Sequence, residues 1–190
     1  TINIDYIKRT SRVVKEENIL RLYVGKELFN FKGGKKWENF FFDNEIVEGT
    51  VAFIYLFGFT AITENEPANN VVSMLNAYFD KMVNEIIKEE GTVDKFLGDA
   101  VMASFKGEFH LDRAMDACLS IRKAIHNSDI TIGSNTYKPE VSIGINSGEM
   151  VWGNIGSAKL RRLDYTVIGE AVKVAARLQG AVKKRTDTYK

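Results

Sequence analysis

The sequence predicts an α/β sandwich with a ferredoxin-like βαββαβ order, preceded by an amphipathic helix. Two observations support this prediction. Short apolar runs of strand length alternate with longer segments in which apolar residues recur every three or four positions. Apolar residues make up 45% of the 190 residues, which is enough for a packed core. This order of elements is typical of a ferredoxin-like sandwich.

The first 47 residues are predicted to form a helical flank. Helical periodicity runs from Ser11 to Phe31, and the Gly33-Gly34 pair ends it. Two interpretations remain open: a helix that packs on its own domain, or a coupling helix that joins the domain to an upstream sensor. Residues 48–190 are predicted to form the main domain.

The main domain begins with a continuous apolar run over Gly49–Phe57, which predicts a buried strand. Thr60 or Thr63 is expected to cap the next helix, whose periodicity continues to Lys88 and ends before Gly91.

Two strands and a second helix follow in the sequence. Thr92–Leu97 and Ala100–Phe105 are predicted as strands joined by a tight Gly98-Asp99 turn, and Leu111–Asn127 as a helix.

The remaining elements complete the predicted order. Glu140–Ile145 and Glu149–Trp152 are predicted as separate strands, because the Asn146-Ser147-Gly148 segment between them favours a turn. Gly169–Leu178 is predicted as a third helix with an alanine-rich face.

Charge and cysteine content narrow the class of protein. With 26 basic and 25 acidic residues, the net charge of +1 gives no field that attracts nucleic acid or an anionic membrane. The single Cys118 fits a reducing compartment, and no apolar run approaches the roughly 20 residues of a membrane span. We expect a cytoplasmic location, either alone or as the cytoplasmic domain of a larger membrane-bound protein.

Several residues have side chains or positions suited to chemistry. Gly58, Phe59 and Thr60 lie between a strand and a helix, where backbone amides can hold phosphate, although on these residues alone an ordinary tight turn is the favoured interpretation. Asp99 lies in a turn and could bind a hard cation or cap local amides. Lys95 interrupts an apolar strand, and a solvated lysine is the simpler explanation. Arg177, beside two alanines, is alone more typical of a surface arginine.

Taken together and in order, the motifs resemble the class III adenylyl/guanylyl cyclase catalytic domain and its fold. The resemblance runs from about Glu48 to Gly180. It is carried by Gly91–Ala103, by Gly144–Glu149 followed by Gly153–Gly156, and by Arg162–Gly169.

This resemblance implies how a nucleotide is bound. Lys95 and Thr166 would contact the purine; a lysine can only donate hydrogen bonds, which favours ATP over GTP. Arg177 would stabilise charge on the α-phosphate. The amides of Gly58-Phe59-Thr60 would receive the β- and γ-phosphates.

The resemblance also implies two ions, Mg²⁺ or Mn²⁺, held by two aspartates. Asp99 would be one, with the Leu56 carbonyl as a neutral ligand, but Tyr55 stands at the position of the other. A phenol is neutral at pH 7, so one ion site is expected to be weakened. The family's sites form across a head-to-tail dimer, here a homodimer or a heterodimer with another cyclase domain.

A second departure is Lys173, where the family usually has an asparagine that orients the ribose. A lysine there could instead contact a phosphate. The family's further phosphate-binding lysine would lie beyond Lys190, so we expect the C-terminal part of the domain to be incomplete.

The sequence therefore predicts an adenylyl cyclase domain that forms cyclic AMP and pyrophosphate from ATP with impaired activity. Two alternatives remain: a pseudo-cyclase that serves as a regulatory nucleotide-binding or dimerisation module, and a purine-binding partner in a heterodimer.

Overall fold

The computed structural model describes residues 44–59, 64, 66–132, 135–157, 159 and 162–188. These residues belong to one compact unit that begins at Asn44. The helix expected over Ser11–Phe31 and the expected caps Thr60 and Thr63 lie outside the described residues. Within them, no helix is both long enough and apolar enough to cross a membrane.

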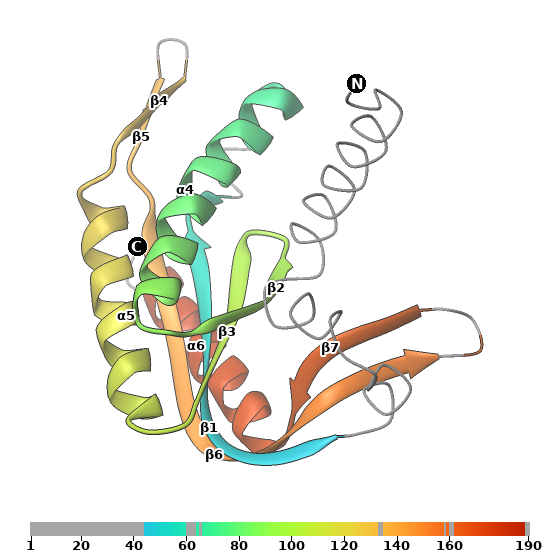
Figure 1. Cartoon of the computed structure of the whole chain (residues 1–190). Coiled ribbons are helices and arrows are strands. Elements are labelled where there is room, and N and C mark those ends of the chain that lie inside the picture. Colours follow the sequence, from blue (N-terminus) through green and yellow to red (C-terminus); the bar gives the residue numbers. More distant parts are fainter. Residues whose placement is uncertain are drawn as a thin grey trace, which may run out of the picture. The chain divides into compact units, whose positions relative to one another are not determined.

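The described elements follow a mixed order of strands and helices (Figure 1). They are β1 (Glu45–Phe57), α4 (Ala68–Lys88), β2 (Thr92–Leu97), β3 (Ala100–Lys106), α5 (His110–His126), β4 (Ile130–Ile132), β5 (Asn135–Tyr137), β6 (Glu140–Ser157), β7 (Arg162–Ile168) and α6 (Glu170–Thr188).

The main sheet has the strand order β2-β3-β1-β6-β7. Every neighbouring pair is antiparallel. The first four strands of this order form the predicted ferredoxin-like core, which is confirmed. Strand β7 extends the sheet beyond β6, and β4 and β5 form a separate hairpin that the sequence reasoning did not predict.

Strand β1 is covered on both faces. Ala52, Ile54 and Leu56 join the core cluster under α4 and α5, whereas Val51 belongs to the cluster on the α6 side. Figure 1 shows α4 and α5 in front of the sheet and α6 behind it. Burial on both faces explains why the run in β1 is continuously apolar rather than alternating.

The predicted turn at Asn146-Ser147-Gly148 is wrong, because β6 is one strand of 18 residues. These three residues pair with Val51, Thr50 and Gly49 of β1 without interruption. The Ser147 and Thr50 hydroxyls also lie 2.7 Å apart and share a hydrogen bond. Pairing along β1 satisfies the backbone of this segment, which overrides its local preference for a turn.

Helix α6 lies directly against β6. A Cβ atom at Gly144 would come within 2.1 Å of the Ala175 carbonyl oxygen and 2.4 Å of the Gln179 nitrogen. Glycine therefore sets the closest approach between strand and helix. The helix is longer than the predicted Gly169–Leu178, since it continues to Thr188.

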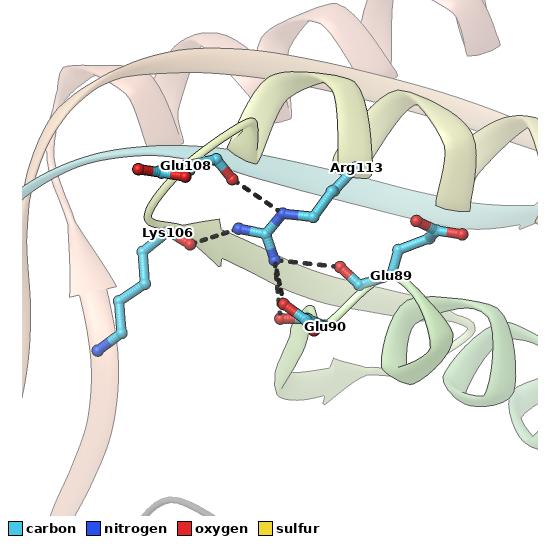
Figure 2. Close-up of polar contacts among 5 residues, drawn as sticks. All are labelled: Glu89, Glu90, Lys106, Glu108 and Arg113. Carbon is cyan, nitrogen blue, oxygen red and sulfur yellow. Dashed lines mark hydrogen bonds and ion pairs between the residues drawn. The ribbon is translucent and has the colours of Figure 1, made fainter.

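Arg113 of α5 forms hydrogen bonds with three chain segments (Figure 2). Its guanidinium donates to the carbonyl oxygens of Lys106 at 2.5 Å, Glu108 at 3.1 Å, Glu89 at 3.3 Å and Glu90 at 3.5 Å. Glu89 and Glu90 follow α4, Lys106 ends β3 and Glu108 precedes α5. Backbone carbonyls at the ends of helices and strands lack a hydrogen-bond donor within their own element. One side chain thus fixes how the two helices join the sheet.

We predict that Arg113→Met lowers the free energy of unfolding by about 2–3 kcal/mol, because the change removes the donor from two partly buried carbonyls, those of Lys106 and Glu89. Urea unfolding followed by circular dichroism measures this loss. The matched control is Arg122→Met on the exposed face of the same helix, which should change stability by less than about 0.5 kcal/mol. Equal effects of the two substitutions would contradict the role of Arg113.

Two weak acids are buried in the core under α4 and α5. Burial, with a smaller contribution from the Asp129 charge, raises the pKa of Tyr78 from 10.0 to about 12. Burial raises the pKa of the Cys118 thiol from 9.0 to about 12. In the folded chain both groups therefore stay neutral at pH values where they ionise in the unfolded chain.

We predict that this difference makes the fold sensitive to alkali. Its stability should be full below about pH 9 and should fall as pH rises toward 12, since the unfolded state then binds fewer protons than the folded state. Urea midpoints measured across this range test the prediction. Tyr78→Phe should make the urea midpoint fall less steeply with pH above about pH 10. An unchanged dependence on pH would contradict the contribution of Tyr78.

Candidate functional site

The end of β1 lies beside the β2–β3 turn. Tyr55 pairs with Ala100, and the Leu56 N–H donates to the Asp99 carbonyl oxygen at 3.0 Å. Positions 55 and 99 are thus neighbours in the sheet, with both side chains partly exposed. The Leu56 side chain is fully buried in the core, and a ligand role for its carbonyl stays a prediction.

The donor groups at this position do not fit a pair of divalent ions. Asp99 offers one carboxylate, and Tyr55 offers a neutral phenol. In the part of the chain that the structure describes, no three His, Cys, Asp or Glu side chains gather where they could hold one ion. Two ions close together need several shared oxygen anions. The described residues of one chain therefore supply an incomplete metal site.

The turn after β1 depends on Gly58. Its φ of +85° lies in the left-handed region, where a side chain would be strained, although the space around its Cβ position is open. Phe59 keeps only 7% of its surface exposed and packs into the core, which anchors the turn. Thr60 lies outside the described residues. Phosphate binding by these amides stays a prediction.

A buried carboxylate joins Lys95 to Thr166. The Thr166 hydroxyl lies 2.8 Å from each carboxylate oxygen of Asp94, to which it donates. The Val167 N–H donates to the same carboxylate at 3.2 Å, and the Lys95 ammonium lies 3.3 Å from it. The two predicted purine-contacting residues therefore meet through Asp94, which the sequence reasoning did not single out.

The local backbone explains why Asp94 points inward. Val93 pairs with Ala103 and Lys95 pairs with Met102, so Asp94 is an extra residue in a β-bulge. A bulge re-aims a side chain, and the Asp94 side chain is only 2% exposed. Burial raises its pKa, while the Thr166 hydrogen bond, the Lys95 charge and the Val167 N–H favour the ionised form. The carboxylate acts here as an acceptor for all three donors.

The first turns of α6 hold a second charged cluster. Glu170 lies 3.3 Å from the Lys173 ammonium and 3.0 Å from the Arg177 guanidinium. All three side chains are about two-thirds exposed. Exposed ion pairs of this kind contribute little energy, so an anionic ligand can displace Glu170 at small cost. The structure brings Lys173 and Arg177 together, and their contacts with a nucleotide stay predictions.

Asp94 and Glu170 are the residues that sequence reasoning missed. Glu170 left a signal, since it precedes Lys173 by three residues and Arg177 by seven on a predicted helix. Asp94 left only a weak one, a carboxylate beside Lys95 in a strand that also contains Val93, Phe96 and Leu97. Its partner Thr166 is 72 residues away in the sequence, so no local pattern connects them.

The sequence motifs and this arrangement agree with a known family. The family described as "Adenylate and Guanylate cyclase catalytic domain" matches residues 43–186. The chain belongs to this cyclase family. Its members generally use divalent metal ions, bind nucleotides and act as dimers.

One longer relative is similar to this chain over part of its length. The uncharacterized protein Rv1319c of Mycobacterium tuberculosis is 38% identical over 128 residues, which cover 67% of this chain and 23% of that protein. The chain thus matches less than a quarter of that relative's length.

Two solved structures are also similar. A bacterial light-regulated adenylyl cyclase is 35% identical with a TM-score of 0.63, covering 73% of this chain and 72% of that one. The guanylyl cyclase Cya2 is 31% identical with a TM-score of 0.62, covering 73% and 71%. The chain is about equally similar to an adenylyl and to a guanylyl cyclase structure. Overall similarity therefore does not decide whether it binds adenine or guanine nucleotides.

We predict that Tyr55→Asp increases Mn²⁺ affinity at least about tenfold, because a second carboxylate is added beside Asp99. Isothermal titration calorimetry with Mn²⁺ measures the change. Tyr55→Asn is the neutral control and should leave the affinity within about threefold of the parent. If the Asp and Asn variants bind Mn²⁺ equally, positions 55 and 99 do not share an ion site.

Proposed function

We propose that this domain is an adenylyl-type class III cyclase with impaired turnover, converting ATP to cyclic AMP and pyrophosphate. The observation that carries the proposal is the position of Tyr55 beside Asp99 at the end of β1. Membership of the family supports the reaction class. The neutral phenol at an ion-binding position supports the impairment.

The reaction joins the ribose 3′-oxygen to the α-phosphorus, breaks the bond to pyrophosphate and releases the 3′-hydroxyl proton. The Arg177 guanidinium supplies positive charge for the α-phosphate in the transition state. Lys95 and Thr166 fix the purine, which holds the ribose near the reacting phosphate. In the family, divalent ions supply further charge to the attacking and leaving oxygens. The incomplete donor set around Asp99 limits that contribution here.

We further propose that the chain works as a head-to-tail dimer, so that each site combines the metal half of one chain with the purine half of the other. In a homodimer every site then carries both Tyr55 and Lys173. A heterodimer whose partner supplies two aspartates would contain one site without the Tyr55 defect. A cytoplasmic location and an upstream sensor acting through residues 1–47 belong to the same proposal.

A regulatory pseudo-cyclase is the second candidate function. It is favoured by Tyr55, which places a phenol instead of a second carboxylate beside the Asp99 turn. In this alternative the domain binds nucleotide or a second cyclase domain without turnover.

We predict slow cyclic AMP formation by the purified chain with Mg²⁺ or Mn²⁺, above the level of an Arg177→Ala control. Tyr55→Asp should raise the rate by on the order of 100-fold, the size of effect typical of one preorganised electrostatic group. Adding Lys173→Asn should raise it further. Parent activity no greater than that of Arg177→Ala would favour the pseudo-cyclase.

A mixing experiment tests the composite site directly. One chain carries Tyr55→Asp and Arg177→Ala, so its metal half is repaired and its purine half is disabled. Mixed with the parent chain, it should form cyclic AMP faster than either protein alone, because one site of the mixed dimer has Asp at position 55 and an intact Arg177. Activity equal to the sum of the separate proteins would contradict head-to-tail pairing.

A further inference from the structure

Asp94 has a position that none of the proposed roles uses. Its carboxylate connects β2 to β7, which form opposite edges of the five-stranded sheet described above. A charge that is only 2% exposed is costly unless it is fully hydrogen-bonded. Here it accepts from the Thr166 hydroxyl, the Val167 N–H and the Lys95 ammonium. The same carboxylate thus fixes both residues proposed to contact the purine.

This contact determines the hydrogen-bonding direction of Thr166. A threonine hydroxyl has one proton and can otherwise act as donor or acceptor. In this structure the proton is directed at the two carboxylate oxygens of Asp94, each 2.8 Å away. A hydrogen bond to a carboxylate is strong enough to hold it there. Any further partner of the Thr166 oxygen must therefore be a donor.

Lys95 provides the complementary group. Its ammonium has three N–H donors and no acceptor, and its side chain is 32% exposed, so it can donate beyond Asp94. Held by one carboxylate, Lys95 and Thr166 together present one donor and one acceptor.

That pair distinguishes the two kinds of purine at positions 1 and 6. We place Lys95 at position 1 and Thr166 at position 6 of the base. Adenine has an acceptor at N1 and an amine donor at N6, so it matches both groups in this placement. Hypoxanthine and guanine have a donor at N1 and a carbonyl acceptor at O6, so both contacts are reversed. A 6-oxopurine would leave the buried Thr166 hydroxyl without a suitable hydrogen-bond partner on the base. Leaving a buried polar group unpaired costs more binding free energy than losing a contact that water can replace.

We propose that Asp94 is a positioning residue for base choice: it holds the Thr166 hydroxyl as an acceptor and Lys95 beside it, so that a 6-aminopurine is bound and a 6-oxopurine is rejected. This inference rests on the proposed nucleotide-binding function. It holds equally for a domain that binds ATP without turnover, because it concerns binding alone.

The test compares ATP with inosine triphosphate, which differs from ATP in the 6-substituent and in the proton on N1. Competition against a fluorescent ATP analogue gives both dissociation constants for the purified chain. We expect the parent to prefer ATP by about tenfold or more, equivalent to about 1.4 kcal/mol. Asp94→Asn should reduce the preference to within about threefold, because an amide can donate and lets the Thr166 hydroxyl turn.

Matched variants separate this role from a structural one. Asp116→Asn changes an exposed carboxylate on α5 and should keep the parent preference. Thr166→Val removes the hydroxyl while leaving Asp94 in place, and should lose the preference as Asp94→Asn does. Thr166→Ser should retain it. Since Asp94 acts through Thr166, the double variant should lose no more than either single variant.

The outcomes divide clearly. If folded Asp94→Asn keeps the parent preference for ATP, the inference is wrong although nucleotide binding stands. If Asp94→Asn does not fold, Thr166→Val decides: a retained preference overturns the inference and a lost one supports it. A parent chain that binds ATP and inosine triphosphate equally also overturns it. A parent that binds neither overturns the proposed function as well.

Discussion

The register of β1 between β3 and β6 is the constraint on which the rest of this domain depends. The strand is paired with β6 along its whole length and with β3 over Gly49–Tyr55, and it is covered on both faces, so its residues have fixed neighbours. A shift by one residue would exchange the faces and expose the core residues Ile54 and Leu56. The same register places Tyr55 next to Ala100 and the Asp99 turn. Core packing and the composition of the candidate metal site are therefore set by one strand.

The sheet also explains why the purine-contacting residues depend on a buried charge. Lys95 and Thr166 belong to strands β2 and β7 at the two edges of the sheet order, and β-ladder pairing does not join them. The Asp94 carboxylate provides the connection, reached through the bulge after Val93. A buried carboxylate with several donors fixes geometry more strictly than apolar contact does, because each hydrogen bond has a preferred direction.

The departures from the family pattern differ in their physical setting. Tyr55 lies in the central strand, where its backbone is fixed by neighbours on both sides. Lys173 lies on an exposed helix surface and shares Glu170 with Arg177. A substitution in the first setting changes the charge available at a rigid position. A substitution in the second changes a cluster of exposed, solvated charges, where adjustment costs little.

The sequence by itself determined the family, the βαββαβ order and the position of most helices and strands, because these follow from periodicity and from motifs that are local in the chain. It failed at Asn146-Ser147-Gly148, where the turn preference of three residues was outweighed by continuous pairing with β1. It also found Lys95 and Thr166 without Asp94. Only the tertiary structure decided that contact, since a carboxylate's hydrogen-bond partners depend on which strands meet in space and not on spacing along the chain.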